Sequence, residues 1–318
     1  MRLFKNPNID FIKKRKIAFI ISSFFIIAGI ISLIINGGPK YGIDFTGGTL
    51  LEFDFTPDEP DLQPIDIQVI RDALSSHGYR DAEIQEFGNP NHILVKIKTS
   101  ENVKEDESKI IKILQDTFPE HAGNKEIVDF ERRSEHVGSK IGEELRGKAI
   151  GAILISLLGI ILYIWWRFEL TYGFAAVLAL FHDVIITIGL FSIFGKEINI
   201  AVIGALLAIV GYSLNDTIVV FVRIREDLRV YRREKYESII NHSINEVLSR
   251  TVITSLTTLV VVLTLYILGG EVIHDFAFAL LCGVIVGTYS SIFIASPILV
   301  AYKNWTIQKK SKTKSKRR

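Results

Sequence analysis

The sequence has 318 residues, of which 48% are hydrophobic, and its mean hydropathy is +0.31. Such a composition excludes an ordinary soluble globular fold for most of the chain. Its single cysteine, Cys282, excludes an intrachain disulfide and a cysteine-rich metal site. Residues 37–146 hold 23 acidic and 13 basic side chains, whereas the rest of the chain holds 12 and 24. This segregation predicts an acidic soluble module attached to a membrane part with basic flanks.

Six segments are long and apolar enough to cross a membrane, for which about 20 residues are needed. The first, residues 17–36, follows the basic arm 1–16. We expect it to be an uncleaved anchor, because its apolar run exceeds that of a signal peptide and no small-residue cleavage site follows. The other five lie within residues 147–303, at about 149–166, 171–195, 198–221, 251–268 and 276–302.

Basic residues gather on one side of the predicted spans. The N-terminal arm, the connection 222–249 and the tail 304–318 are all rich in Lys and Arg. An even number of crossings puts all three on the same side, and short basic segments are typical of the cytoplasm. We therefore expect cytoplasmic termini and residues 37–146 outside. The basic tail is more typical of contact with anionic lipids than of binding to nucleic acid or a ribosome.

Residues 37–146 predict an α+β domain with a ferredoxin-like order, βαββαβ. The pattern comes from the alternation of apolar residues in strands, their spacing in helices, and a Gly-Asn-Pro-Asn turn. In chain order we expect a strand at 51–55, a helix at 64–78, strands at 82–87 and 92–98, a helix at 103–118 and a strand at 127–132. The histidines of this domain lack metal-ligand spacing, so no metal site is predicted. Binding of an unfolded chain or a partner subunit is the function we favour for it.

A glycine-rich stretch, GIDFTGGT, leads into the first predicted strand and contains Gly42, Asp44, Gly47 and Gly48. It lacks the pattern G-x-x-x-x-G-K-[ST] and precedes a strand, so we do not expect nucleotide binding. These glycines instead predict a backbone turn that joins the first span to the sheet.

Two ionisable residues stand out at the fourth and fifth spans. Such groups cost about 2.5–3.5 kcal/mol each on insertion scales and therefore suggest function. Asp216 lies in the fourth span, and Arg250 opens the fifth. Desolvation favours a protonated carboxyl and a nearby cation favours the carboxylate, so a group between both influences can bind and release a proton. We predict that Asp216 is an ion relay in contact with Arg250. One alternative is that Asp216 forms an interhelical hydrogen bond or ion pair that serves only assembly. The other is that the side chain of Arg250 simply extends to the cytoplasmic face.

Four further polar residues are candidates for a secondary relay or for helix packing: His182, Asp183, Asn215 and Thr254. Small residues also recur at packing intervals, in the series Gly204, Ala208, Gly211 and Asn215 and in the pair Gly283 and Gly287. The sequence leaves open whether the helices that pack on them belong to this chain or to another subunit.

Taken together, these motifs are similar to those of the SecF family, within the SecD/SecF family of the RND superfamily. The similarity covers almost the whole chain. It rests on GIDFTGGT at 42–49, HDVIIT at 182–187, GYSLNDTIVVFVRIRE at 211–226, SRTVITSLTTL at 249–259, LYILGG at 265–270 and the run at 283–298. One departure is Val222, where the family often carries an acidic residue.

The resemblance implies half of an RND-type 6+6 arrangement in the bacterial inner membrane. It implies a protein-export subunit and not an enzyme. The subunit would act on unfolded preproteins together with SecD, the SecYEG channel and, as a further candidate, YajC. No nucleic acid and no cofactor are implied, and the coupling ion is H⁺ with Na⁺ as the alternative. Asp216 would match the family's relay aspartate and Arg250 its essential arginine, while a further essential aspartate belongs to SecD.

Three other functions stay open at this point. The runner-up is half of an RND-type exporter of small molecules or lipids. The next is an assembly factor whose buried charges only hold subunits together. A membrane enzyme ranks last, because the sequence offers no nucleophile–base pair and no set of metal ligands.

Overall fold

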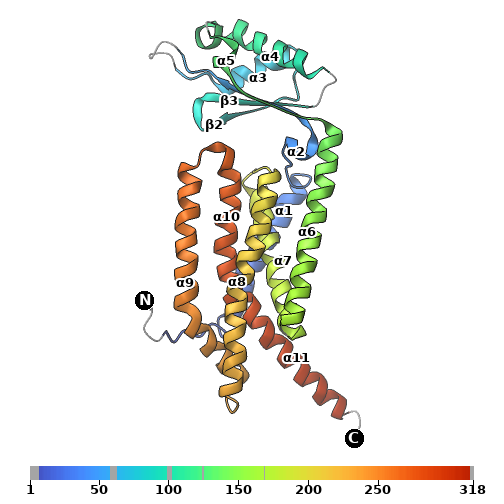
Figure 1. The fold of residues 1–318 in the computed structure, drawn as a ribbon, viewed down its shortest axis with the longest axis vertical. Coiled ribbons are helices and arrows are strands. Elements are labelled where there is room, and N and C mark those ends of the chain that lie inside the picture. Colours follow the sequence, from blue (N-terminus) through green and yellow to red (C-terminus); the bar gives the residue numbers. More distant parts are fainter. Residues whose placement is uncertain (1–6, 58–62, 99–101, 124, 168, 316–318) are drawn as a thin grey trace. The chain divides into compact units, whose positions relative to one another are not determined.

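The computed structural model describes residues 7–57, 63–98, 102–123, 125–167 and 169–315. The chain divides into two compact units, an α+β domain at residues 41–151 and a membrane unit at residues 1–40 and 152–318 (Figure 1). Among the described residues, six helices are long and apolar enough to span a membrane.

The α+β domain contains one antiparallel sheet with the strand order β2-β3-β1-β4. Helix α3 connects β1 to β2, and α4 connects β3 to β4. The elements are β1 Gly48–Asp54, α3 Ile67–Ser76, β2 Glu83–Phe87, β3 Asn89–Ile97, α4 Val103–Thr117 and β4 Glu131–Val137. The predicted βαββαβ order and ferredoxin-like sheet are confirmed.

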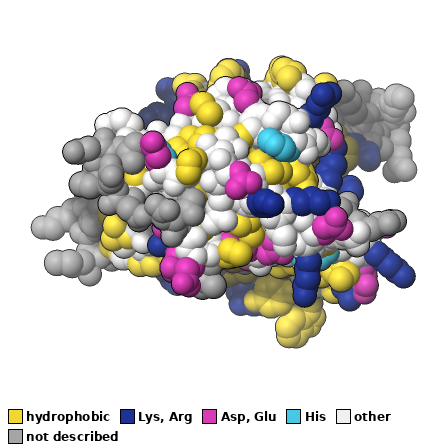
Figure 2. All heavy atoms as spheres, turned by 90° about the horizontal axis from the view of Figure 1, so that it is seen from above, with side chains coloured by type: hydrophobic (Ala, Val, Ile, Leu, Met, Phe, Trp, Pro, Cys, Tyr) yellow, Lys and Arg dark blue, Asp and Glu magenta, His cyan; other side chains and the backbone are white. Residues whose placement is uncertain are grey.

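The core of this domain lies between the sheet and its helices. Helix α3 contributes Ile70 and Leu74, one turn apart, and α4 contributes Ile110 and Leu114 with the same spacing; all four are fully buried. Burial of each such side chain stabilises the fold by about 1.5–3 kcal/mol. The face above these helices carries acidic, basic and hydrophobic side chains interspersed (Figure 2).

The closing strand begins later than predicted. Residues Ile127–Phe130 form a helical turn, α5, and β4 follows at Glu131–Val137. The turn places the fully buried ring of Phe130 against Phe53 and Phe55, with centroids 5.0 and 5.1 Å apart. The polar sequence after it then pairs with β1 at the edge of the sheet, where exposed polar side chains are normal.

The membrane unit is helical throughout its spans. In chain order it contains α1 Arg15–Ile35, α6 Ser139–Arg167, α7 Leu170–Ile193, α8 Ile200–Val230, α9 Tyr236–Leu268, α10 Glu271–Ser290, the π-helical segment η2 Ser291–Ala295 and α11 Ser296–Ser315. Helices α1 and α7 approach closely, since a Cβ atom on Gly29 would lie 2.7 Å from the Cα of Gly189. Glycine at both positions therefore sets the spacing of these two helices.

The segment 222–249, expected as a basic loop, is mostly helical. Helix α8 continues to Val230 and α9 begins at Tyr236. Arg223 accounts for part of the extension, because its guanidinium pairs with Asp227 one turn later, at 3.1 Å, and with Glu246 of α9. Ile224 is fully buried, so the extension is packed against neighbouring helices rather than free in solvent.

Candidate functional site

Asp216 lies on α8 and is 3% exposed. Ser255 of α9 donates a hydrogen bond from Oγ to its Oδ2, at 3.3 Å. Thr288 of α10 in turn donates to Ser255, with the two hydroxyl oxygens 2.7 Å apart. A short chain of hydroxyl groups thus connects three helices to one buried carboxyl group.

Arg250 does not make the predicted direct contact with Asp216. Among the described residues, no ion pair within 4.0 Å joins the two. The side chain of Arg250 is exposed. The displacement has a simple cause: Arg250 precedes Ser255 by five residues on α9, which is about 7–8 Å of helix rise.

The small-residue series on α8 faces away from the other helices of this chain. Gly204, Ala208, Gly211 and Asn215 are all exposed, and a Cβ atom on Gly204 or Gly211 would have no described atom within 4 Å. Thr254 of α9 is exposed as well, and its hydroxyl donates to the carbonyl oxygen of its own helix at Arg250, 3.0 Å away. This outward face, Gly204 to Asn215, lies on the helix that carries Asp216.

Gly283 and Gly287 on α10, in contrast, face another helix of this chain. A Cβ atom on Gly283 would overlap the side chain of Ile209, and one on Gly287 would lie 3.0 Å from the Cβ of Ser213. This second small-residue motif therefore packs α10 directly on α8, inside the chain.

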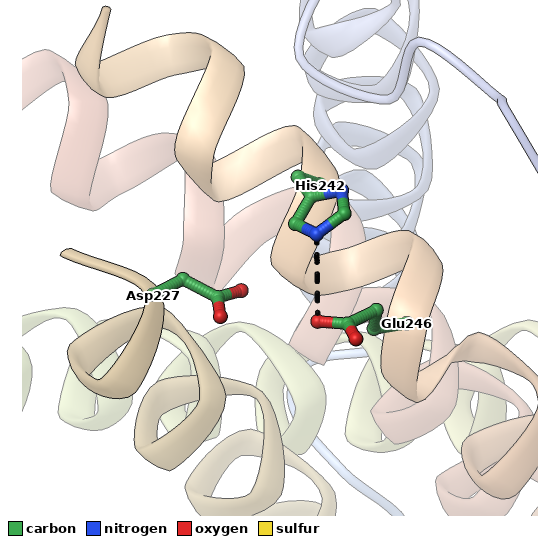
Figure 3. Close-up of side chains that lie close together, drawn as sticks. All are labelled: Asp227, His242 and Glu246. Carbon is green, nitrogen blue, oxygen red and sulfur yellow. Dashed lines mark ion pairs between the residues drawn. The ribbon is translucent and has the colours of Figure 1, made fainter. Parts of the chain in front are cut away.

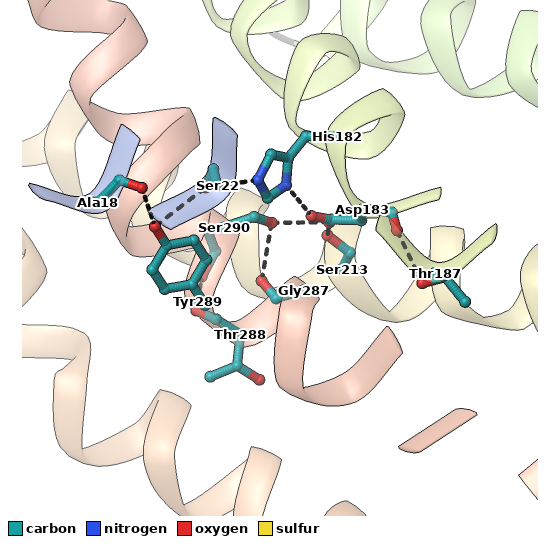
Figure 4. A network of polar contacts seen from close by, with 11 residues as sticks. Ala18, Ser22, His182, Asp183, Thr187, Ser213, Gly287, Thr288, Tyr289 and Ser290 are labelled. Carbon is teal, nitrogen blue, oxygen red and sulfur yellow. Dashed lines mark hydrogen bonds and ion pairs between the residues drawn. The ribbon is translucent and has the colours of Figure 1, made fainter. Parts of the chain in front are cut away.

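His182 and Asp183 lie in a buried polar network on α7 (Figure 4). His182 Nδ1 lies 2.9 Å from Asp183 Oδ1, and Ser213 and Ser290 both donate to Asp183 Oδ2. His182 Nε2 lies 2.9 Å from the Oγ of Ser22 on α1. The network joins α1, α7, α8 and α10 at one level of the bundle.

The hydroxyl partners in this network were missed from the sequence. Ser22, Ser213, Tyr289 and Ser290 are hydroxyl residues in largely apolar helices, and such residues are common without a role. The one signal was spacing: Ser213 precedes Asp216 by three residues, so both lie near one face of α8.

The glycine stretch forms the predicted turn. A four-residue helix, α2 Ile43–Thr46, follows Gly42, and the chain then passes through Gly47 and Gly48 with φ of 71° and 145°. L-residues avoid such angles, and a Cβ atom on Gly48 would lie 2.7 Å from the carbonyl oxygen of Ile97. Gly142 was not identified from the sequence. A Cβ atom added at Gly142 would lie 2.9 Å from the backbone nitrogen of Gly47, so this position also requires glycine.

Asp227, His242 and Glu246 are the type of residues that bind metal ions, and their ligand atoms lie within 4.8 Å of one another (Figure 3). Arg223 already pairs with both carboxylates, and Ser243 donates to Asp227 at 2.7 Å. The cluster therefore joins the ends of α8 and α9 as an ion-pair network, and a divalent cation would have to displace the guanidinium.

Two family models match the chain. The model described as protein export membrane protein SecD/SecF, C-terminal, matches residues 120–305, and the SecD/SecF GG motif matches residues 32–59. The C-terminal model covers every polar residue of the membrane site except Ser22 of α1. The GG-motif match contains the turn at Gly47 and Gly48.

Relatives and solved structures agree with these matches. Proteins named protein translocase subunit SecF include one from Desulfurispirillum indicum, 46% identical over 93% of this chain and 92% of the relative. Another, from Vibrio alginolyticus, is 44% identical over 91% and 88%. The crystal structure of SecDF from Thermus thermophilus superposes with a TM-score of 0.81 at 38% identity. It matches 94% of this chain, which spans 39% of the solved one.

Proposed function

Because the chain belongs to the SecD/SecF family of protein-export membrane proteins, we propose that it is a SecF-type subunit that couples ion movement at Asp216 to preprotein export. The observation that carries this proposal is the environment of Asp216. Its carboxyl group is 3% exposed and, in the part of the chain that the structure describes, accepts one side-chain hydrogen bond, from Ser255 at 3.3 Å. An ionised carboxylate with so little compensation is unstable in a membrane, so the group is suited to gain and lose a proton.

Protonation of Asp216 would change the contacts between three helices. As a carboxylate it accepts from Ser255, and as a carboxyl group it can donate to Ser255 instead. Thr288 has a choice of acceptors, Ser255 Oγ and the carbonyl oxygen of Val284, both 2.7 Å away. The proton on Asp216 thereby selects how α8, α9 and α10 are hydrogen-bonded to one another.

The energy for this change would come from the ion gradient. Transfer of one charge through the membrane potential yields about 2.3 kcal/mol per 100 mV. We assign H⁺ as the coupling ion, with Na⁺ as the alternative, and no cofactor. The exposed Arg250 acts on the carboxylate from a distance in this conformation. Its proposed role is to approach Asp216 in another conformation of the cycle, when the carboxylate is ionised.

The outward face of α8 is proposed to bind a SecD-type subunit. Gly204, Gly211 and their neighbours allow a helix to approach closely, and Asn215 provides a polar contact beside Asp216. The solved SecDF chain is more than twice as long as the part matched by this chain, so it has room for such a partner in the same polypeptide. Asn215 and Thr254 would then contact SecD rather than transfer protons.

The remaining parts of the proposal concern location and substrate. We place both termini in the cytoplasm and the α+β domain outside the inner membrane of a bacterium, where it would bind unfolded preprotein leaving SecYEG. The mixed charges and hydrophobic side chains on the domain's exposed face suit a flexible polypeptide of varied sequence (Figure 2). YajC is a further proposed partner in this complex, and membrane lipids surround the spans.

The proposal is tested by pulse-chase export of a secretory protein in cells that depend on this chain. We expect Asp216→Asn to assemble with its partner, measured by co-purification, and to fail in export. The matched control is Asp275→Asn on α10, which removes a carboxylate that pairs with Lys196 at 2.9 Å. Cells with this variant are expected to export normally. Normal export by assembled Asp216→Asn would contradict the proposed ion relay at Asp216, and only the assignment of fold and family would stand.

A further inference from the structure

We propose that His182 and Asp183 hold one proton between them and form a second proton site in the membrane, separate from Asp216. The inference comes from the direction of the hydrogen bonds around the pair, which can be followed from α1 to α8 (Figure 4).

The argument begins at the carbonyl oxygen of Ala18, which can only accept. Tyr289 lies 2.7 Å from it and must donate, which uses the one hydrogen of the phenol. Toward Ser22, at 3.1 Å, the Tyr289 oxygen must then accept, so Ser22 donates its only hydrogen to Tyr289. Ser22 therefore accepts from His182 across the 2.9 Å contact, and the Nε2 atom of His182 carries a hydrogen.

The other side of the ring faces Asp183. Both Ser213 and Ser290 donate to Oδ2, so Oδ1 is left for Nδ1 of His182, 2.9 Å away. A bare nitrogen and an ionised oxygen would repel each other at this distance. A second hydrogen must therefore lie between Nδ1 and Oδ1, on either atom. The pair then carries two hydrogens and no net charge.

The surroundings favour retention of that proton. Asp183 is 1% exposed and His182 is 8% exposed, so loss of the shared proton would leave a negative charge in an apolar interior. Among the described residues, Tyr289 of α10 is the titratable side chain in contact with this network, while α1 and η2 bring none within their spanning parts. On α8 the nearest titratable groups are Tyr212 and Asp216, one residue before and three residues after Ser213; on α10 Cys282 lies two turns before Ser290.

Release of the proton would detach α1. Without a hydrogen between them, His182 and Asp183 no longer attract each other, and the ring would turn away from both Asp183 and Ser22. Ser22 is 4% exposed and belongs to α1, the helix that precedes the glycine turn in the chain. The shared proton therefore stabilises the contact of α1 with α7.

The test is solid-state NMR of the full chain in lipid bilayers, labelled with ¹⁵N in histidine. At pH 8.5, where exposed histidines are neutral, we expect one ring with hydrogen on Nε2 and with Nδ1 either protonated or strongly hydrogen-bonded to a proton. His182→Gln should remove this signal. A wild-type His182 with a bare Nε2, or one that loses its proton together with the exposed histidines, would overturn the proposal.

Two variants separate this site from general packing and from Asp216. Tyr289→Phe keeps the ring that packs on Phe293, 5.2 Å between centroids, but frees Ser22 to donate to His182. We expect Nε2 of His182 to lose its hydrogen, seen as the ¹⁵N signal of a bare ring nitrogen at pH 8.5, because Ser22 can then donate to it. Tyr302→Phe, on the exposed side of α11, should leave the hydrogen on Nε2 as it is in the wild type.

Asp216→Asn should leave the His182 signal unchanged even where it abolishes export. The failure of either idea is therefore visible without the other. A His182 signal that disappears in Asp216→Asn would show a single shared site and would overturn the claim of a separate one.

Discussion

Asp54 of the α+β domain and Asp216 of the membrane unit are buried carboxyl groups that differ in how their charge is compensated. In the α+β domain Asp54 is 7% exposed and meets Arg132 at 3.0 Å and Lys125 at 3.6 Å. In the membrane unit Asp216 is 3% exposed and meets a hydroxyl at 3.3 Å, with no ion pair within 4.0 Å among the described residues. The first charge is compensated permanently by its own chain. The second is left to a proton or to a partner, which is the property expected of a coupling site.

The same contrast holds for packing. The α+β domain encloses its aromatic core of Phe53, Phe55 and Phe130 within one chain. The membrane unit uses Gly283 and Gly287 for internal contact but leaves the small residues of α8 exposed beside Asp216. One unit encloses its core within this chain, and the other leaves exposed the small-residue face that is proposed to bind a SecD-type subunit.

The largest effect is expected from Gly283→Leu. Its side chain would overlap Ile209 at the contact between α8 and α10, and overpacking of this kind costs about 3 kcal/mol or more in a tight interface. We expect little folded protein by fluorescence-detected size-exclusion chromatography. Gly211→Leu is the matched control, because it points outward: it should fold normally yet lose co-purification with the partner. Equal behaviour of the two variants would contradict the distinction between internal and outward faces.

A smaller effect is expected from Asp54→Asn in the α+β domain. The change leaves Lys125, with 14% of its side chain exposed, as a buried cation without its carboxylate. We expect a loss of about 1–3 kcal/mol in the free energy of unfolding of this domain, measured by hydrogen exchange of β1 and β3 in the full chain. Asp81→Asn removes an ion pair of 2.7 Å to Lys98, but both side chains are at least 75% exposed, so exchange should hardly change. Equal effects would mean that burial of the pair does not matter.

The smallest effect concerns Glu131 at the start of β4. Burial and the neighbouring carboxyl group of Glu107 raise the pKa of Glu131 to about 7. The folded domain therefore holds this proton more tightly than the unfolded chain, and its stability falls as the pH rises from about 4.5 to about 7. Since solvent screens this half-exposed pair, we expect Glu131→Gln to stabilise the domain by about 1 kcal/mol at pH 8 and not at pH 4.

Limited proteolysis of the full chain at both pH values measures this difference. The exposed residue Glu86 provides the control, and Glu86→Gln should change neither rate. Stabilisation by Glu131→Gln at pH 4 of the same size as at pH 8 would contradict the assigned proton.

Much of the fold could be predicted from the sequence because the membrane spans and the strand order depend on local hydrophobic patterns. The buried position of Asp216 within an apolar helix was also predictable, since a carboxyl group in such a helix is rare; its role as an ion relay stays a prediction. The errors share a cause in tertiary contacts. The strand β4 begins later because the ring of Phe130 packs in the core. Helix α8 is longer than predicted because Arg223 forms ion pairs with Asp227 and with Glu246 of the next helix, α9.

Hydrogen-bond networks were the least predictable part of the site. Ser22 and Tyr289 have no sequence signal that connects them with His182, because the contact depends on how α1, α7 and α10 pack. Arg250 shows the converse, since its place in the sequence suggested a contact with Asp216 that the helix rise of α9 prevents in this conformation.

The central claim is that Asp216 couples an ion gradient to export. The most direct measurement is preprotein transport into inverted membrane vesicles, scored as protease-protected product with the proton gradient present or collapsed by an ionophore. The account predicts that the gradient stimulates transport by wild type and has no effect on assembled Asp216→Asn, and a sodium ionophore identifies which ion is used. Equal stimulation of both proteins by the gradient would contradict it.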